Sequence, residues 1–560
     1  MDNKLRQKLR NKFSRSRILK KKLNLEDLPN SENKKFILIQ IDGLPYTLLQ
    51  KLKDTKYMPF LGSLLKSYNL SKFDPGYPST TPFVQAGIIY GDNFNIPAFR
   101  FYDKEKGLAM ELSSEGIAKL IEDELELKNK GMLRGGTSIG TIFSGGADRA
   151  VLTMSKITQS KATPKSFKDI MQLILLHPKS SLKVLFFSFS ELFIEMIDSV
   201  IDIFRSLKNG GHFNWPFFPP YIPFYRIMIN SIAKEVSTRV ALLEMDRNVP
   251  YMYIVYIGFD LIGHYRGPEN LSSYSVLRQI DIDVKKLYQK AIKQDYDVYI
   301  VSDHGMVPSM PFHKVYHETF EDFVERISKI KVEATKGDTE RSGRTNYVYY
   351  KLKYYYRNFS VPLKAASWAM INILNLAFKR EQKRFKTHSN KRKGMSIHYS
   401  SSLADIYFTD YKGILNKKDI EKNHPYMLDK LVGHPGVGFI IVKDGNNYEV
   451  LSDNGKVIIK PSSVVFEGER FLKIYGDEER LVKQIRVLVK QKYSPDIIVN
   501  GNFDGKKIIA FEEFHFGSHD SIGAGQNDAF LISKEKLDLS EVTNAKELNK
   551  IFERYHQKGL

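Results

Sequence analysis

The sequence predicts an α/β protein whose core is one mainly parallel sheet flanked by helices. Short, continuous runs rich in Ile, Val and Tyr are typical of strands buried on both faces. Helical patterns lie between these runs, and strands alternating with helices are the pattern of a parallel sheet. Hydrophobic residues make up 42% and charged residues 27% of the 560 residues, which is a globular composition.

Five runs are predicted to be buried strands, and helical periodicity separates them. The predicted strands are Phe36–Ile41, Tyr251–Ile257, Val298–Val301, Gly438–Val442 and Ile497–Val499. Met58–Ser67 and Ser273–Lys293 are predicted helices in the intervening sequence. The strand-helix alternation therefore extends over most of the chain.

Two stretches interrupt this alternation. Residues 160–248 hold long helical patterns and an aromatic, proline-rich loop at His212–Arg226, and residues 321–397 are basic and rich in Tyr. We therefore predict a helical cap insertion at 160–248 that covers the functional site and a second, basic insertion at 321–397. The division predicted for the whole chain is a basic tail at 1–35, core parts at 36–159 and 249–320, and a last core part with a C-terminal helix at 398–560.

The segment Leu182–Phe204 is apolar enough to suggest a membrane span, but it contains four acids. Glu191, Glu195, Asp198 and Asp202 follow one another at i, i+4, i+7 and i+11, which places them on one stripe of a helix. Four carboxylates in a bilayer core would be prohibitive. The segment is therefore predicted to be an amphipathic helix.

The net charge of +21 is concentrated in two stretches. Residues 1–35 contain twelve Lys/Arg and four Asp/Glu, and residues 351–394 contain twelve Lys/Arg and one acid. Basic residues confined to a tail and an insertion favour a docking surface, such as an anionic membrane, over nucleic acid, which usually meets basic residues spread through the core elements. The apolar segment Val361–Phe378 has basic flanks and is predicted to be an interfacial helix, with a core helix as the alternative.

The cysteine content and the N-terminal sequence further restrict the class of protein and its location. The chain has no cysteine, which excludes disulfide scaffolds, Cys-ligated metals and Cys nucleophiles. The basic N-terminus is not followed by an apolar segment typical of a secretory signal. We therefore expect a cytoplasmic protein or one peripheral to the inner membrane face.

Acids and histidines follow three of the predicted strands. Asp42 comes after the first strand, Asp260 and His264 after the second, and Asp303 and His304 after the third. Functional groups collect beyond the carboxyl ends of strands in such sheets. Carboxylate and imidazole without thiolate are the ligands of zinc or a similar divalent ion in a catalytic site.

Five sequence blocks resemble the alkaline phosphatase superfamily, and most closely its type I phosphodiesterase/nucleotide pyrophosphatase family. The blocks are IQIDG (39–43), YPSTTPFVQAGIIYG (77–91), FDLIGHYRGP (259–268), VSDHGM (301–306) and FGSHDSIGAGQ (516–526). They occur in the family's order between residues 39 and 526. The resemblance implies an alkaline-phosphatase-like core.

The resemblance also implies a site for two divalent metals and a nucleophile. One metal would be held by Asp260, His264 and His519, and the other by Asp42, Asp303, His304 and Thr81. Zinc is favoured by analogy, and manganese accepts the same ligands. Thr81 would be the nucleophile, since a hydroxyl attacks only when a metal or a base removes its proton.

Two positions depart from the family pattern. The family has an Asn about twenty residues after the nucleophile to bind a phosphoryl oxygen, whereas this sequence reads IPAFRFYD (96–103). Arg100 is the candidate substrate-binding residue there, with a surface arginine as the alternative. The family usually has Gly where Asp520 follows His519.

These features predict a hydrolase of phosphodiester or pyrophosphate bonds, nucleotide or lipid-linked, that acts through a phosphothreonine intermediate. A phosphomonoesterase with the same site is the first alternative. A sulfatase is disfavoured because the site has Thr where sulfatases need a modified Cys or Ser. A catalytically inactive relative that binds membrane or nucleic acid is disfavoured by the complete set of ligands.

Overall fold

The computed structural model describes residues 20, 25–29, 34–157, 177–208, 222–335 and 394–557. Several predictions lie outside the described residues. They concern the interfacial helix Val361–Phe378, the basic stretch 351–393, most of the 1–35 tail and positions 212–221 of the aromatic loop.

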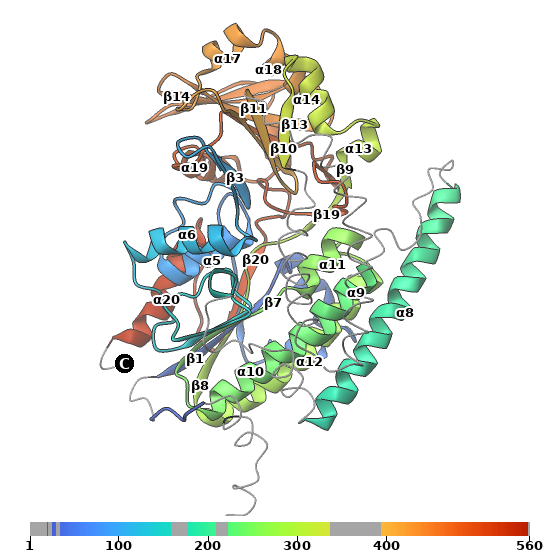
Figure 1. The fold of residues 1–560 in the computed structure, drawn as a ribbon, viewed down its shortest axis with the longest axis vertical. Helices are drawn as coiled ribbons and strands as arrows, with labels where there is room; N and C mark the ends of the chain where they lie inside the picture. Colours follow the sequence, from blue (N-terminus) through green and yellow to red (C-terminus); the bar gives the residue numbers. More distant parts are fainter. Residues whose placement is uncertain are drawn as a thin grey trace, which may run out of the picture.

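The main sheet has seven strands and lies in the lower half of Figure 1. Its order is β2 (Asn69–Phe73), β20 (Ala529–Ser533), β8 (Tyr296–Ser302), β1 (Lys35–Ile41), β7 (Tyr251–Tyr256), β5 (Thr137–Ile139) and β6 (Arg149–Val151). The pairs from β8 to β6 are parallel, and β20 runs antiparallel to both of its neighbours. The predicted mainly parallel sheet is confirmed, and three of the five predicted strands form its centre.

Helices cover both faces of this sheet because its strands present apolar side chains on both sides. Ile37 and Ile39 point to one face, whereas Phe36 and Leu38 point to the other. The first face packs against α3 (Tyr46–Leu52), α4 (Pro59–Leu64), α10 (Lys234–Asp246), α11 (Gly258–Arg266) and α12 (Leu271–Ala291). The second packs against α5 (Thr81–Tyr90), α6 (Glu115–Glu126) and α20 (Asn549–Glu553).

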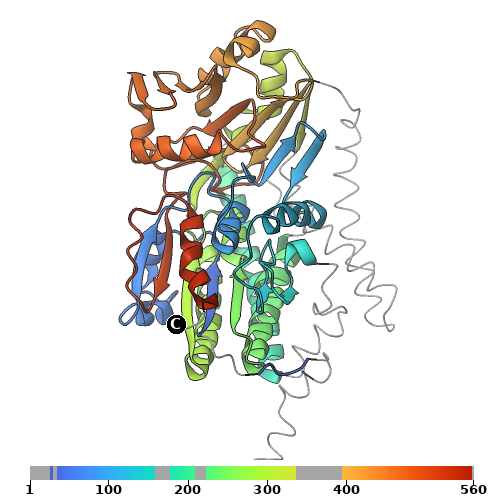
Figure 2. The same ribbon diagram turned by 90° about the vertical axis from the view of Figure 1, so that its left-hand side faces the viewer.

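A second sheet of eight strands stands above the first (Figure 2). Its order is β10 (Val332–Thr335), β11 (Met395–Ser400), β12 (Leu403–Phe408), β17 (Ile497–Gly501), β13 (Val437–Asp444), β14 (Asn447–Ser452), β15 (Gly455–Ile459) and β16 (Val464–Gly468). Helices α14 (Phe320–Ser328), α17 (Lys417–Asn423) and α18 (Met427–Val432) cover one face, and α19 (Glu478–Leu488) covers the other.

The predicted strands Gly438–Val442 and Ile497–Val499 are confirmed as strands but not as members of the parallel sheet. They are β13 and β17, which pair antiparallel with each other in the second sheet. A continuous apolar run predicts burial on both faces, and helices do cover both faces here. An apolar run does not indicate the direction of its strand relative to its neighbours. The sequence therefore did not predict a second, antiparallel sheet.

Smaller elements connect the two sheets. One is the hairpin of β3 (Arg100–Asp103) and β4 (Leu108–Glu111). Another is the three-stranded sheet of β18 (Ile508–Ala510), β9 (Val307–Pro311) and β19 (Gly517–Ser518). Helix α13 (Phe312–Tyr316) follows β9 in the chain. Short 3₁₀ turns occupy Met154–Lys156, Ile292–Gln294, Phe471–Ile474, Ala545–Leu548 and Arg554–His556.

The described part of 160–248 contains one peripheral helix and a helical segment that packs on the main sheet. α8 (Pro178–Lys208) lies at the periphery of the molecule (Figure 1). α9 (Ile222–Arg226) and a π-helical turn (Ile227–Ala233) lead into α10, so the last five residues of the predicted loop His212–Arg226 are helical instead. α10 packs on the sheet through Val236 and Val240. The proposed boundaries of the cap and of the other segments stay a prediction. Within the described residues, no helix is long and apolar enough to cross a membrane.

Candidate active site at the carboxyl edge of the main sheet

Three neighbouring parallel strands end at the same edge of the main sheet and bring their following residues together. Ile41 of β1 pairs with Tyr256 of β7, and Gln40 of β1 pairs with Val301 of β8. Asp42 follows β1, Asp260 lies in the first turn of α11 after β7, and Asp303 follows β8. Acids that are more than two hundred residues apart in the sequence therefore meet at one edge.

Gly43 allows the acids to approach one another closely. Its φ is +72°, and a Cβ atom there would lie 2.9 Å from Asp260 Oδ1. Its backbone N–H donates a hydrogen bond of 3.1 Å to Asp303 Oδ1. A side chain at this position would push Asp260 out of the site, which gives the glycine of the IQIDG block a physical reason.

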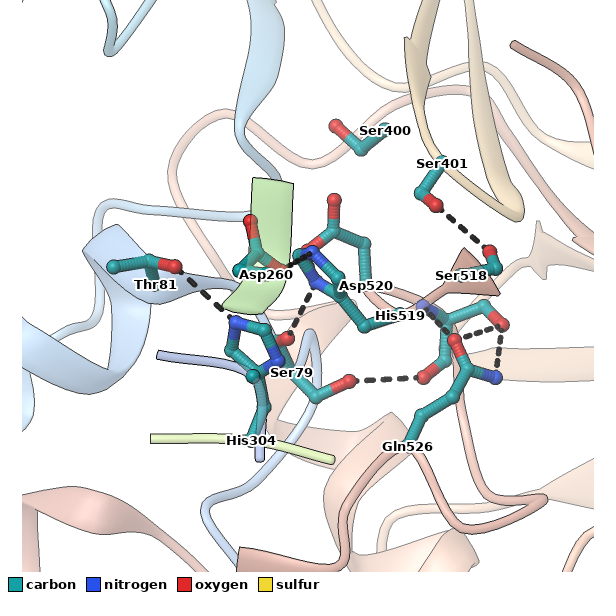
Figure 3. A network of polar contacts seen from close by, with 12 residues as sticks. Ser79, Thr81, Asp260, His304, Ser400, Ser401, Ser518, His519, Asp520 and Gln526 are labelled. Atoms are coloured by element: carbon teal, nitrogen blue, oxygen red, sulfur yellow. Dashed lines mark hydrogen bonds and ion pairs between the residues drawn. The ribbon is translucent and has the colours of Figure 1, made fainter. Parts of the chain in front are cut away.

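Thr81 is the hydroxyl that faces the acids and histidines. Its Oγ1 lies 3.3 Å from Asp42 Oδ1. Figure 3 shows its contact with His304 Nε2, which lies 3.2 Å away. The neighbouring Ser79 hydroxyl instead donates to the Ser521 carbonyl at 3.2 Å. Thr81 is also the first residue of α5, so the partial positive charge of a helix N-terminus lies at the same place.

Asp260, His264 and His519 form a first cluster of potential metal ligands. His519 Nε2 lies 3.2 Å from Asp260 Oδ1 and 2.9 Å from His264 Nε2, and His264 Nε2 lies 3.4 Å from Asp260 Oδ1. All three residues are buried. Their ligand atoms therefore converge on one small volume, although the residues come from two different parts of the chain.

Asp42, Asp303 and His304 form a second cluster beside the first. His304 Nε2 lies 3.3 Å from Asp303 Oδ2 and 3.6 Å from Asp42 Oδ1. The His304 ring stacks on the His519 ring with the centroids 3.9 Å apart, so His304 is near both clusters. Each of two triads, Asp260–His304–His519 and Asp42–Asp303–His304, has its potential ligand atoms within 4.8 Å of one another.

Burial and neighbouring charges shift the pKa values of three residues of the site. Burial, together with the charge of Asp260, raises the pKa of Asp303 to about 6. Burial and the neighbouring His519 lower the pKa of His304 to about 4, which keeps its imidazole neutral and available as a ligand. Burial alone would lower the pKa of His519, but Asp520 and Asp260 outweigh it and raise that pKa well above its ordinary value.

This donor set fits divalent cations. Oδ2 of Asp303 is buried without a hydrogen-bond donor, which is costly unless a cation compensates the charge. Oxygen and imidazole nitrogen are the ligands of zinc and manganese. The two buried Asp/His clusters are therefore consistent with a dinuclear metal site.

Comparison with known proteins identifies the family. The profile of the type I phosphodiesterase/nucleotide pyrophosphatase family matches residues 36–415, more than half of the chain. The chain belongs to this family. The resemblance predicted from the five sequence blocks is thereby confirmed, and with it the assignment to the alkaline phosphatase superfamily and to phosphodiesterase/nucleotide pyrophosphatase-like hydrolases.

Solved structures are similar to this chain at low sequence identity, whereas no curated protein matches the sequence. Phosphonoacetate hydrolase from Sinorhizobium meliloti 1021, in complex with phosphonoformate, is 10% identical; the match covers 94% of this chain and 95% of that one, with a TM-score of 0.46. Murine ectonucleotide pyrophosphatase/phosphodiesterase 5 is also 10% identical over 94% and 96% of the chains, with a TM-score of 0.44. Its inactive variant in complex with AMP is 12% identical over 93% and 94%, with a TM-score of 0.40.

Hydrogen bonds to the backbone orient the histidines of this family member. His264 Nδ1 donates to the Gly517 carbonyl at 2.8 Å, and His304 Nδ1 donates to the Gly305 carbonyl at 3.0 Å. Fixing Nδ1 as the donor leaves Nε2 as the lone-pair atom that points into the site, the usual arrangement of metal-binding histidines.

Asp520 gives His519 a different partner. Asp520 Oδ1 lies 2.7 Å from His519 Nδ1, and the residue adopts a φ of +75° (Figure 3). Glycine adopts this backbone conformation at no steric cost, which explains why the family usually has Gly here. In this chain the strained position is occupied by a carboxylate that makes His519 more basic.

His515 was missed by the sequence analysis. Its ring lies 4.1 Å from the His264 ring, centroid to centroid, and its Nε2 lies 3.0 Å from Glu512 Oε2. Burial alone would raise the pKa of Glu512, but His515 and Arg100 hold it well below its usual range. The sequence signal that could have indicated His515 is its position four residues before His519.

The predicted substrate-binding residue Arg100 is buried and paired within the protein. Its Nη1 donates to Glu512 Oε1 at 2.7 Å and to the Tyr399 carbonyl at 2.8 Å, and the side chain is 1% exposed. The alternative of a surface arginine is wrong. The role of Arg100 in binding substrate stays a prediction.

The turn between β11 and β12 reaches into the active site from the second sheet. Ser401 Oγ lies 2.7 Å from Ser518 Oγ and 3.0 Å from His515 Nδ1. Ser402 Oγ lies within hydrogen-bonding distance, 3.0 Å, of the His519 carbonyl and the Gln526 side chain. The second sheet therefore supports the segment that contains the last metal-ligand candidate.

Proposed function

We propose that this chain hydrolyses phosphodiester or pyrophosphate bonds through a covalent phospho-Thr81 intermediate. The observation that supports the proposal is the position of Thr81 Oγ1, which faces both Asp42 and His304 at the N-terminus of α5. The proposed ligands are Asp260, His264 and His519 for one divalent ion. For the other they are Asp42, Asp303, His304 and Thr81.

The residues of the site supply the groups that a two-step displacement needs. Thr81 Oγ1 donates its hydrogen bond to Asp42 Oδ1, which gives the proton an acceptor as Oγ1 bonds to phosphorus. The bond from phosphorus to the leaving oxygen breaks, and that oxygen takes up the proton. Water then attacks phosphorus, the bond to Thr81 Oγ1 breaks, and one water proton restores the hydroxyl.

Charge is stabilised throughout this sequence by groups fixed in advance. Two divalent cations, when bound, supply Lewis acidity that lowers the pKa of the hydroxyl and offsets charge on the phosphoryl oxygens. The N-terminus of α5 presents its partial positive charge at the same place. The buried position of Thr81, which is 8% exposed, limits the water that would screen these charges.

We further propose zinc as the metal, with manganese as the alternative, and a nucleotide or lipid-linked phosphoester as the substrate. The description of the matched family as nucleotide pyrophosphatases is the reason to include nucleotides. The basic stretches 1–35 and 351–394 support a location at an anionic membrane face.

Mass spectrometry of the acid-quenched enzyme tests the mechanism directly. After mixing with bis-p-nitrophenyl phosphate, which loses one p-nitrophenolate in the first step, we expect a p-nitrophenylphosphoryl adduct on the peptide that contains Thr81. Thr81→Ala should abolish the adduct and lower turnover by roughly 10³-fold or more. Ser79→Ala is the matched control, because its hydroxyl only meets the Ser521 carbonyl, and should retain the adduct.

The same assay separates the proposed function from its first alternative. Faster turnover of p-nitrophenyl phosphate than of the bis ester would indicate a phosphomonoesterase. Persistence of hydrolysis in Thr81→Ala, with the protein folded, would show that Thr81 is not the nucleophile.

A further inference from the structure

Helix α8 presents its apolar side chains to the outside and its polar side chains to the protein. Phe186, Phe189 and Phe193 are 67%, 70% and 59% exposed, whereas Glu191 and Glu195 are 0% and 1% exposed. A helix at the surface of a water-soluble domain ordinarily has the opposite orientation. The amphipathic helix predicted at 182–204 is present, but it is inverted with respect to solvent.

The acidic face of α8 is held by two arginines of the neighbouring helices. Arg226 donates to Glu191 Oε2 at 2.9 Å and to Glu195 Oε2 at 2.8 Å, and it lies 3.4 Å from Asp198 Oδ2. Arg266, at the end of α11, also pairs with Glu195. The Arg226 side chain is 1% exposed, so these are interior ion pairs rather than surface contacts.

Further polar contacts hold the first half of the helix. Lys183 pairs with Glu235 at 2.7 Å and with Asp283. Gln279 of α12 donates to Glu191 Oε1 at 2.7 Å. Rotation of α8 about its axis to bury the phenylalanines would separate these charges from their partners. An uncompensated buried charge is strongly destabilising. The outward orientation of the apolar face is therefore built into the fold.

The apolar face is continuous. Among the described side chains from Leu182 to Phe204, every one that is exposed is apolar. They are Leu182, Leu185, Phe186, Phe189, Leu192, Phe193, Met196, Ile197, Val200, Ile201 and Phe204. At 1.5 Å per residue the stripe is about 33 Å long. Helix α8 lies along one side of the molecule (Figure 1), and exposed apolar patches of this kind mark interaction sites.

We propose that the apolar face of α8 docks on an anionic lipid bilayer, with the helix lying in the plane of the headgroups and its phenylalanines among the acyl chains. A long helix with one wide apolar face suits this position. The chain's charge of +21 is attracted to anionic lipid, whereas two copies of such a chain repel each other. The charge therefore favours a bilayer over a second copy.

Docking through α8 would place the active site beside the membrane. Arg266 contacts Glu195 of α8 and is two residues from His264 in the same helix α11. The inference does not depend on the proposed hydrolysis, because it rests only on the orientation and contacts of α8. If both hold, the enzyme acts on phosphoesters at the bilayer surface.

The absence of cysteine allows a site-specific test. Phe189→Cys in the full-length chain introduces a unique thiol for an environment-sensitive fluorophore on the apolar face of α8. Leu127→Cys is the matched control, since Leu127 is an 87% exposed apolar residue that follows α6 on the opposite face of the main sheet. The labelled proteins are mixed with vesicles of phosphatidylglycerol and phosphatidylcholine, or of phosphatidylcholine alone.

With anionic vesicles we expect the fluorophore at 189 to shift to the blue and to be quenched by lipids brominated on their acyl chains. The fluorophore at 127 should remain in water. Phe186→Ser/Phe189→Ser/Phe193→Ser in the unlabelled chain should weaken vesicle binding ~10-fold or more at high salt, where the basic stretches are screened.

Three results would overturn the proposal. Vesicle binding without any change at 189 would mean that other parts of the chain bind lipid. A blue shift at 189 without lipid, together with a dimer mass in light scattering, would assign the face to a second copy. A fluorophore at 189 that is shielded in the lipid-free monomer and unaffected by vesicles would mean that the chain itself covers the face.

Discussion

Replacement of Arg226 by Met tests whether buried ion pairs hold α8 on the protein. Arg226 forms ion pairs with three carboxylates, and its loss leaves them in the interior without its positive charge. Methionine keeps the length and apolar stem of the side chain. The variant therefore removes the charge with little change in packing.

The cost follows from the contacts that remain. Removal of one partner from a buried ion pair costs about 3–5 kcal/mol. Glu191 keeps its hydrogen bonds from Gln279 and Asn230, and Glu195 keeps Arg266, so we expect the lower value, about 3 kcal/mol. Since about 1.4 kcal/mol corresponds to a factor of ten, the opening equilibrium of α8 should rise roughly 10²-fold.

Hydrogen–deuterium exchange of peptides within 185–200 measures this opening directly, because amide exchange reports the free energy of local unfolding. Arg278→Met is the control: Arg278 is a 44% exposed partner of Asp281 at 3.5 Å, and surface pairs contribute about 0–1 kcal/mol. Glu191→Gln/Glu195→Gln added to Arg226→Met should restore part of the protection, because it neutralises the stranded acids.

The reasoning would be refuted if Arg226→Met left exchange in these peptides within about threefold of the wild type. It would also be refuted if Arg278→Met accelerated exchange equally. Either result would mean that contacts other than the buried arginine hold the helix in place.

Two further variants test the site and the charged interior. Asp520→Gly removes the carboxylate 2.7 Å from His519 Nδ1 and puts glycine at a φ of +75°, so we expect metal affinity to fall ~10- to 100-fold in chelator competition without a lower unfolding temperature. Burial lowers the pKa of Lys234 to about 7, so folding favours its neutral form and wild-type stability falls as the pH drops from the unfolded-state pKa of 10.5 toward 7. Lys234→Met should therefore stabilise the protein more at pH 6 than at pH 9 in thermal unfolding, and an equal effect at both pH values would contradict that shift.

Most of the candidate metal ligands could be predicted from the sequence because they follow strands, and continuous apolar runs predict those strands. Asp42, Asp260 and Asp303 come after continuous apolar runs, and parallel pairing brings such ends together without further information. His519 follows no predicted strand, so only the resemblance of its sequence block to the family suggested it as a ligand.

Other features depend on contacts that a local pattern does not encode. The stripe of acids in α8 predicted an amphipathic helix, but its orientation is decided by Arg226 and Arg266, which lie far along the chain. The periodicity of a helix specifies that it has two faces and not which of them meets the protein. The direction of β13 and β17 is set in the same way, by the partners of each strand.

The turn between β11 and β12 has a consequence for how the enzyme matures. Ser401 and Ser402 support the segment around His519, while Asp42 is near the other end of the chain. N-terminal domains generally fold first during synthesis. The set of candidate metal ligands, however, is complete only when both sheets have formed and His519 has left the ribosome. A nascent chain without that segment lacks one of the proposed ligands, so any metal would be bound only after both sheets are in place.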